Sequence, residues 1–212
     1  MSALPDESWR TRVTRFKGDL EIVESITTRA LTPAQLGKLV RALQFASRKH
    51  SFQRRKDPSE SPYINHPIAV VDHLVKVGNV FDCETLIAAL LHDTVEDTDT
   101  TQEELNVTFG VEIGKLVGEV TDNKTLQADV RKQLQIEHAP FLSFEAKLIK
   151  LSDLSCNLAD VIDSPPPWSD QRRYDYLLWT EQVVAGCRGT NEPLEGFYDR
   201  LNKKGKRILR RG

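Results

Sequence analysis

Cysteine is scarce in this sequence. Its 212 residues include three, Cys83, Cys156 and Cys187, and none of them forms a Cys-x-x-Cys pair. An odd number of thiols without such a pair argues against a disulfide framework and is typical of a reducing compartment. Long apolar runs are missing as well, since none approaches the ~20 residues of a membrane span. The first residues lack the apolar core of a signal peptide, so we expect a cytoplasmic protein that makes no membrane contact.

Positive charge is not in excess either, because the formal net charge is −2. A nucleic-acid partner is therefore not expected. Strand-like alternation and internal repeats are also missing, whereas helix-like spacing of apolar residues recurs along the chain. The sequence is 39% apolar and long enough for one domain with a core. We expect a single all-α domain over residues 32–204, with its last helix ending at Lys204, preceded by an extension, 1–31, and followed by a basic tail, 205–212.

The extension, residues 1–31, carries apolar side chains at helical spacing. They are Trp9, Val13, Phe16, Leu20, Val23 and Ile26. This pattern predicts an amphipathic helix, which either packs on the surface of the domain or forms a contact with another subunit. Both interpretations stay open, and with them the oligomeric state.

The start of the domain is well marked. Thr32 followed by Pro33 is a helix cap with a proline at the first helical position. The core face predicted for this first helix is a stripe at helical spacing, widened by Leu39 and Ala46, that ends at His50. Its other members are Leu36, Val40, Leu43 and Ser47.

The stretch 86–98 is the most suggestive of chemistry. Six apolar residues, which predict a buried helix, lead into His92-Asp93, and Glu96 and Asp97 follow within one turn. A buried imidazole or carboxylate without a partner is costly, and a partner side chain or a metal ion removes that cost. Neighbouring residues on a helix point ~100° apart. Both members of the His-Asp pair can therefore reach one ion only if it lies off the end of the helix.

Two distant residues complete a candidate metal site. His66 opens a helix next to Pro67, and Asp153 shares one face of a later helix with Asn157 and Asp160. A lone His-Asp pair is more often structural. Together with His66 and Asp153, however, it makes a mixed nitrogen and oxygen donor set from three helices, which suits Mn, Fe or Zn.

A basic loop precedes His66. Arg54, Arg55 and Lys56 lie in the polar stretch 51–61. These side chains form either a solvated run of charge or a phosphate clamp, since arginine and lysine are the usual partners of polyphosphate oxygens.

Longer motifs surround these residues. They are Arg54-Arg55-Lys56-Asp57-Pro58, Tyr63-Ile64-Asn65-His66-Pro67, the run from Ala88 to Asp99, Glu119-Val120-Thr121-Asp122-Asn123-Lys124-Thr125-Leu126 and Arg188-Gly189-Thr190-Asn191. With the order His, His-Asp, Asp, the chain resembles the HD metal-dependent phosphohydrolases, and within them the stand-alone metazoan SpoT-like hydrolases. The resemblance covers residues 36–204. It implies the HD-domain helical fold, with a metal site between the core helices.

The resemblance also implies an activity and the residues that perform it. The activity is hydrolysis of the 3′-diphosphate of guanosine 3′,5′-bis(diphosphate), or ppGpp, to give GDP and pyrophosphate. The implied ligands of one divalent metal, Mn²⁺, are His66, His92, Asp93 and Asp153, and the implied catalytic pair that activates water is Glu96 and Asp97. The implied substrate-binding residues are Arg55, Lys56, Lys124, Asn157, Arg172 and Tyr176.

The sequence departs from the family beside the last metal ligand. Two positions that are usually basic there are Leu154 and Ala159. Metal binding is expected to survive this change, whereas affinity for the nucleotide is less secure. Two alternatives to ppGpp hydrolysis therefore stay open, namely removal of phosphate from NADPH at the same site and nucleotide binding without catalysis. The presence of Glu96 and Asp97 argues against the second.

Overall fold

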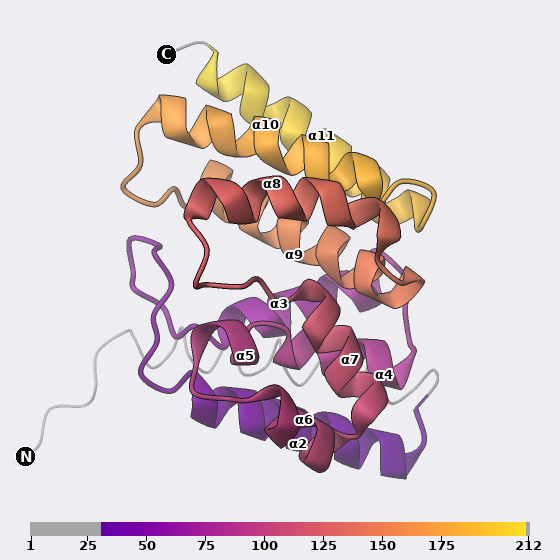
Figure 1. Cartoon of the computed structure of the whole chain (residues 1–212). Helices are drawn as coiled ribbons and strands as arrows, with labels where there is room; N and C mark the ends of the chain where they lie inside the picture. The colour runs from indigo at the N-terminus through magenta and orange to yellow at the C-terminus, as the bar shows by residue number, and fades with distance from the viewer. Residues whose placement is uncertain (1–30, 211–212) are drawn as a thin grey trace, which may run out of the picture.

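The structure, a computed structural model, describes residues 31–210. The helix expected within the N-terminal extension lies outside this range. The described chain is built from helices (Figure 1), which confirms the all-α prediction. The helices are α2 (Pro33–Lys49), α3 (Asn65–Lys76), α4 (Cys83–Leu91), α5 (Thr94–Asp97), α6 (Gln102–Phe109), α7 (Val111–Val120), α8 (Ala128–His138), α9 (Phe144–Asp163), α10 (Asp170–Gly186) and α11 (Glu192–Leu209), with a 3-10 turn, η1 (Ala139–Phe141), between α8 and α9. None of them is both long and apolar enough to cross a membrane.

Side-chain caps fix where several helices begin. Thr32 and Gln35 form a capping box on α2, in which each side chain accepts a hydrogen bond from the backbone N–H of the other. Asp82 on α4 and Ser143 on α9 each accept the backbone N–H three residues later. These bonds satisfy N–H groups that have no partner within the helix. They fix the starts of α4, which leads directly into His92, and of α9, which contains Asp153.

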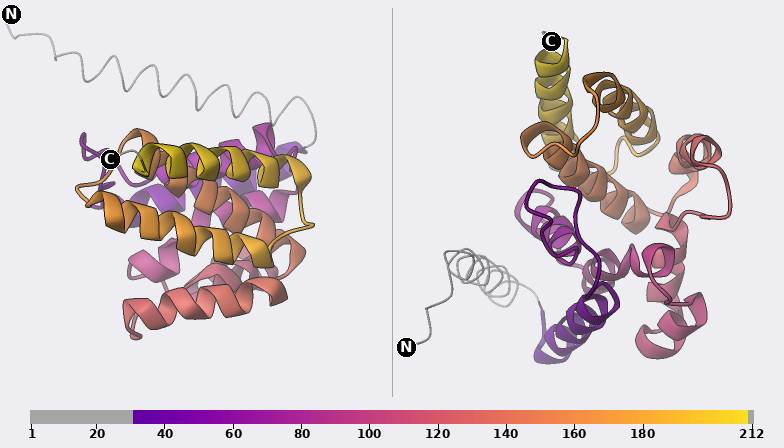
Figure 2. Two further views of the ribbon diagram at one scale, coloured as in Figure 1. Left: turned by 90° about the horizontal axis from the view of Figure 1, so that it is seen from above. Right: turned by 90° about the vertical axis from the view of Figure 1, so that its left-hand side faces the viewer.

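Helix α9 is the central element of the domain. It packs against α3, α4, α7, α10 and α11, and it lies between the pair α10 and α11 and the lower helices of Figure 1. Figure 2 shows α10 and α11 running side by side along one flank. The apolar side of α9, formed by Leu148, Leu151, Leu154 and Leu158, is buried as predicted. Because α3, α4 and α9 all pack against one another, polar groups at their ends are brought into one place.

The core face of α2 differs in part from the expected one. Leu39 and Ala46 are buried as expected, but Ala42 and Phe45 are buried as well, whereas Val40 is 39% exposed. The sequence of α2 has apolar residues on two overlapping stripes, and packing against α4 selects the stripe that contains Ala42 and Ala46. Small residues there let two helices approach closely, which the spacing of Leu36, Val40 and Leu43 does not reveal.

The last helix continues beyond its expected end. We expected α11 to stop at Lys204, but it runs to Leu209. Gly205 is buried, and a Cβ atom at this position would lie 2.6 Å from Leu177 Cδ2 and 2.9 Å from Ile162 Cδ1. The absence of a side chain therefore lets α11 pack tightly on α9 and α10, so the glycine serves helix packing and does not end the helix.

Candidate active site

The His92-Asp93 pair lies at a break between two helices. Helix α4 ends at Leu91 and α5 begins at Thr94, so both residues lie in the turn between them. The hydroxyl of Thr94 donates to Leu91 O at 2.6 Å, which satisfies a carbonyl left free at the end of α4. His92 Nε2 and Asp93 Oδ2 are 3.0 Å apart. The break therefore lets two adjacent side chains converge, as a site off the end of the helix requires.

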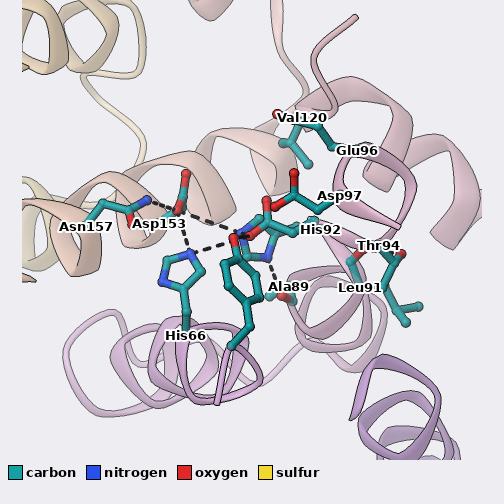
Figure 3. A network of polar contacts seen from close by, with 12 residues as sticks. His66, Ala89, Leu91, His92, Thr94, Glu96, Asp97, Val120, Asp153 and Asn157 are labelled. Atoms are coloured by element: carbon teal, nitrogen blue, oxygen red, sulfur yellow. Dashed lines mark hydrogen bonds and ion pairs between the residues drawn. The ribbon is translucent and has the colours of Figure 1, made fainter. Parts of the chain in front are cut away.

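Side chains from three segments meet beside this turn (Figure 3). His66 on α3, His92 and Asp153 on α9 present ligand atoms that all lie within 4.8 Å of one another. His66 Nε2 is 3.0 Å from Asp153 Oδ1, and His92 Nε2 is 3.8 Å from the same oxygen. Asn157 Nδ2 donates to Asp153 Oδ1 at 2.6 Å and holds this carboxylate in place. The long-range set expected from the sequence is thus brought together.

The donor atoms of this cluster fit a divalent metal. His92 Nδ1 donates to Ala89 O at 2.8 Å, which leaves Nε2 facing the cluster. This Nε2 is buried and makes no hydrogen bond. Burial opposes the charged form of His92, yet Asp93 and Asp153 raise its pKa well above the ordinary value. The carboxylates thus favour a positive charge between them, which is the electrostatic environment that a divalent cation needs.

Asp93 lies at the edge of the cluster. Its Oδ2 is 3.7 Å from His66 Nε2, and it accepts a hydrogen bond from the hydroxyl of Tyr63 at 2.6 Å. Burial opposes ionisation of Asp93, but His92 and His66 lower the pKa of this carboxyl. Burial also raises the pKa of Tyr63, so its hydroxyl stays a donor. Asp93 is therefore an ionised carboxylate that can act as an oxygen ligand, and the hydrogen bond from Tyr63 fixes its orientation.

Glu96 lies on α5, one turn beyond the His-Asp pair. Its Oε2 accepts the backbone N–H of Asp122 at 3.0 Å, and its Oε1 lies 3.7 Å from Lys124 Nζ and 3.6 Å from Arg131 Nη1. Burial raises the pKa of Glu96 to about 6. A carboxyl with this pKa is ionised at neutral pH but accepts a proton more readily than an ordinary glutamate.

Asp97 is held more tightly than Glu96. It forms an ion pair with Lys124, and its Oδ2 accepts a hydrogen bond from Gln53 Nε2 at 3.0 Å. Gln53 is fixed in turn by His50 Nδ1, which lies 2.7 Å from its Oε1. Asp97 therefore connects α5 to the basic loop through Gln53 and to the turn after α7 through Lys124. Glu96 accepts one hydrogen bond, from the backbone of Asp122.

Two adjoining cavities, of about 410 and 430 Å³, form one cleft beside the cluster. They share the wall residues Lys56, Tyr63, Asp97, Asn157, Trp168 and Tyr176. The second cavity also reaches His92, Asp93 and Asp153. Every residue expected to bind substrate lines the cleft, namely Arg55, Lys56, Lys124, Asn157, Arg172 and Tyr176.

A hydrogen-bond chain joins the basic loop to the metal cluster. Arg55 Nη2 donates to Asn157 Oδ1 at 3.0 Å and to Asp160 Oδ2 at 2.5 Å. Asn157 then donates to Asp153, so the face predicted for Asp153, Asn157 and Asp160 is confirmed. Because Arg55 belongs to this chain, its guanidinium is directed at the cleft and is not simply solvated.

Several residues of the cleft were not predicted from the sequence. Tyr63 was quoted within a motif without a role, although it lies three residues before His66 and contacts Asp93. Trp168, whose ring centroid lies 4.4 Å from the guanidinium carbon of Arg172, has no signal in the sequence that marks it as a cleft residue. Arg131 lies on α8, which reads as a polar, exposed helix. Lys150 gave one usable signal, because it is a lysine on the otherwise apolar side of α9.

The raised pKa of Glu96 predicts a pH-dependent change in stability. The ordinary pKa of a glutamate is 4.5, and the pKa of Glu96 in the folded protein is about 6. The protonated form of Glu96 therefore contributes to the free energy of unfolding in full below pH 4.5, and this contribution is lost as pH rises through about 6. The Glu96 side chain is only 18% exposed. A Glu96→Gln change, which fixes the neutral form, should raise the free energy of unfolding of the metal-free protein by about 2 kcal/mol at about pH 7.5 and little at about pH 4.

Chemical denaturation of the metal-free wild type and variant at both pH values measures this difference. The exposed carboxylate Glu103 provides the control, since Glu103→Gln should change stability equally little at both. An equal effect of Glu96→Gln at the two pH values would contradict the assignment of a raised pKa.

Comparison with known proteins gives a consistent result. Residues 42–175 match the HD domain family. The chain is 51% identical over 164 residues to the Xenopus tropicalis guanosine-3′,5′-bis(diphosphate) 3′-pyrophosphohydrolase MESH1, a match covering 77% of this chain and 92% of that protein. The Homo sapiens protein of the same name is 49% identical over 172 residues, covering 81% and 96%. The structure of a metazoan ortholog of SpoT that hydrolyses ppGpp and plays a role in starvation responses matches with a TM-score of 0.80 and 45% identity, covering 85% of this chain and 99% of that one.

Proposed function

The chain belongs to the HD domain family, as a member of its MESH1-like branch, and from this premise we propose that its cleft hydrolyses the 3′-diphosphate of ppGpp. It is a guanosine-3′,5′-bis(diphosphate) 3′-pyrophosphohydrolase that gives GDP and pyrophosphate. One observation carries the proposal: a match of about half identity spans more than nine-tenths of the MESH1 proteins. The HD domain match encloses the cluster of His66, His92 and Asp153 as well.

The metal of this reaction is Mn²⁺, one ion per chain, held by His66, His92, Asp93 and Asp153. Two imidazole nitrogens and two carboxylates suit a borderline divalent cation of this kind. The buried, unbonded Nε2 of His92 supports this assignment. A divalent metal supplies a Lewis acid that neutralises phosphate charge and lowers the pKa of a coordinated water.

Glu96 is the general base of the reaction. Its carboxylate accepts the proton of the attacking water. The backbone N–H of Asp122 holds Glu96 Oε2, whereas Oε1 accepts no hydrogen bond from the described residues and can take the proton. Asp97 orients this region, because its ion pair with Lys124 and its bond from Gln53 fix α5 against the basic loop. The water oxygen forms the new bond to phosphorus as the bond from phosphorus to the 3′-oxygen breaks. The proton taken by Glu96 is returned to the 3′-oxygen, so the products are pyrophosphate and GDP with a free 3′-hydroxyl.

The remaining cleft residues bind the nucleotide. Arg55, Lys56 and Lys124 provide positive charge for phosphate oxygens, and arginine does so with two parallel donors. Asn157 and Tyr176 lie in the wall shared by both cavities. The guanidinium of Arg172 stacks on the ring of Trp168. The ring centroids of Trp168 and Tyr176 are 5.8 Å apart. This group offers flat surfaces of the kind on which a purine base stacks.

A turnover assay of the Mn²⁺-loaded protein on ppGpp and on NADPH, run side by side, tests the proposed function. We expect metal-dependent release of pyrophosphate from ppGpp at a higher kcat/KM than release of phosphate from NADPH. That result would also show that Leu154 and Ala159 are tolerated beside the metal ligands. Absence of ppGpp turnover in protein with bound metal would reject the proposed substrate.

A further inference from the structure

Lys150 is a buried lysine without an anionic partner. It lies on α9 one turn before Asp153, and it is 8% exposed. Its Nζ is 3.5 Å from Val120 O and 3.5 Å from Gln135 Oε1, both neutral and both at the limit of a hydrogen bond. Between residues 31 and 210 Lys150 forms no ion pair. Since a buried, unpaired ammonium destabilises a fold, its place here points to an anion that binds from outside the chain.

Arg131 on α8 is a second cation that is only loosely paired. Its Nε is buried and makes no hydrogen bond. Its Nη1 is 3.6 Å from both Glu96 Oε1 and Asp122 Oδ2, which is too far for a hydrogen bond. Two cations on facing helices thus retain donors that the described part of the chain does not use.

The two cations lie in the same part of the cleft. Arg131 and Lys150 both line the cavity that contains His92 and Asp153, and both also line an adjoining smaller cavity of about 180 Å³. Gln135 lies between them, with its Nε2 donating to Asp122 Oδ2 at 2.7 Å. This bond turns the Gln135 amide oxygen toward Lys150, so the glutamine positions the ammonium without neutralising it.

We propose that Lys150 and Arg131 form a subsite for the terminal phosphate of the 3′-diphosphate group. This inference rests on the proposed hydrolase function. The phosphate next to the 3′-oxygen must lie by the metal ligands and Glu96, and the terminal phosphate then extends along the same wall. An ammonium without an ion pair and a guanidinium with spare donors compensate there the charge that builds up on departing pyrophosphate. The subsite accordingly favours diphosphate esters over monophosphate esters such as the 2′-phosphate of NADPH.

Removing the ammonium tests the subsite, with Lys150→Met keeping most of the side-chain volume. We expect kcat/KM on ppGpp to fall about 10- to 100-fold, whereas kcat/KM on guanosine 5′-diphosphate 3′-monophosphate changes less than about threefold. Arg131→Gln should give the same pattern. Lys147→Met is the matched control, because Lys147 lies on the same helix but donates to Pro140 O outside the cleft. An equal loss on both nucleotides would overturn the subsite and show a structural role for Lys150.

Binding of pyrophosphate to the metal-free protein separates this inference from the proposed function. Calorimetry in the presence of a chelator should give a dissociation constant that rises about tenfold or more in Lys150→Met and stays unchanged in Lys147→Met. The unfolding temperature of Lys150→Met should not fall, since the change removes an unpaired buried charge. Equal pyrophosphate affinity in wild type and Lys150→Met would reject the subsite even if ppGpp is hydrolysed. A failure of ppGpp turnover with this binding difference intact would instead reject the substrate.

Discussion

The His92→Ala variant is expected to lose both its metal and at least about 10³-fold of kcat/KM on ppGpp. A bound metal supplies several kcal/mol of charge stabilisation in reactions of this type, and each tenfold in rate corresponds to about 1.4 kcal/mol. His92 is central to the cluster because its Nε2 lies 3.0 Å from Asp93 Oδ2 and 3.8 Å from Asp153 Oδ1. Without His92, the carboxylates of Asp93 and Asp153 lose the imidazole that lies between them. Elemental analysis of the purified variant and steady-state kinetics measure the two losses.

His73→Ala is the matched control for a buried histidine outside the cluster. His73 is 8% exposed, and its Nδ1 is 3.2 Å from Ser152 Oγ, while its ring packs on Phe197. Burial lowers the pKa of His73 to about 4, so it is neutral at physiological pH. This variant should unfold at a lower temperature and keep its metal and its turnover. Retention of metal and activity in His92→Ala, or loss of both in His73→Ala, would contradict the assignment of the cluster.

The metal cluster could be predicted from the sequence because its signals are local and long. His92 and Asp93 follow a continuous apolar run, so burial of a charged pair was evident without a structure. His66 and Asp153 are distant in the chain. His66 lies at the start of α3 and Asp153 within α9, and the apolar face of each helix is easily recognised in the sequence. The resemblance to HD phosphohydrolases then supplied the pairing of these residues. What the sequence did not give is their convergence through a break between α4 and α5, which depends on bonds such as that of Thr94 to Leu91 O.

Other features depend on tertiary packing, and their prediction from the sequence was therefore wrong or missing. The face of α2 is chosen by α4, and the end of α11 is set by the space around Gly205. Helix spacing alone carries neither piece of information. The same holds for Lys150, which forms no ion pair among the described residues, and for Arg131, whose Nε makes no hydrogen bond. An unpaired cation is visible only when every neighbouring carboxylate has been placed.

Glu96→Gln is expected to lower kcat on ppGpp by about 10²- to 10⁴-fold while leaving the metal bound. Glutamine keeps the size of the side chain and the acceptor for the Asp122 N–H, but it cannot take a proton from water. Glu96 lies outside the cluster of ligand atoms formed by His66, His92 and Asp153, so metal content should stay at the wild-type level. The stability gain expected for this variant at neutral pH gives the loss of activity a physical interpretation. The fold bears the cost of a buried carboxylate because that carboxylate must be ionised to act as a base.

Asp97→Asn distinguishes a base from an orienting residue at the next position. Asp97 is already paired with Lys124 and Gln53, so its replacement should weaken these bonds and lower kcat less than Glu96→Gln does. Asp99→Asn is the control, because Asp99 is exposed and contacts only Lys49 among the described residues. It should leave kcat and metal content unchanged. Full turnover in Glu96→Gln, or a larger loss in Asp97→Asn than in Glu96→Gln, would move the role of base from Glu96 to its neighbour.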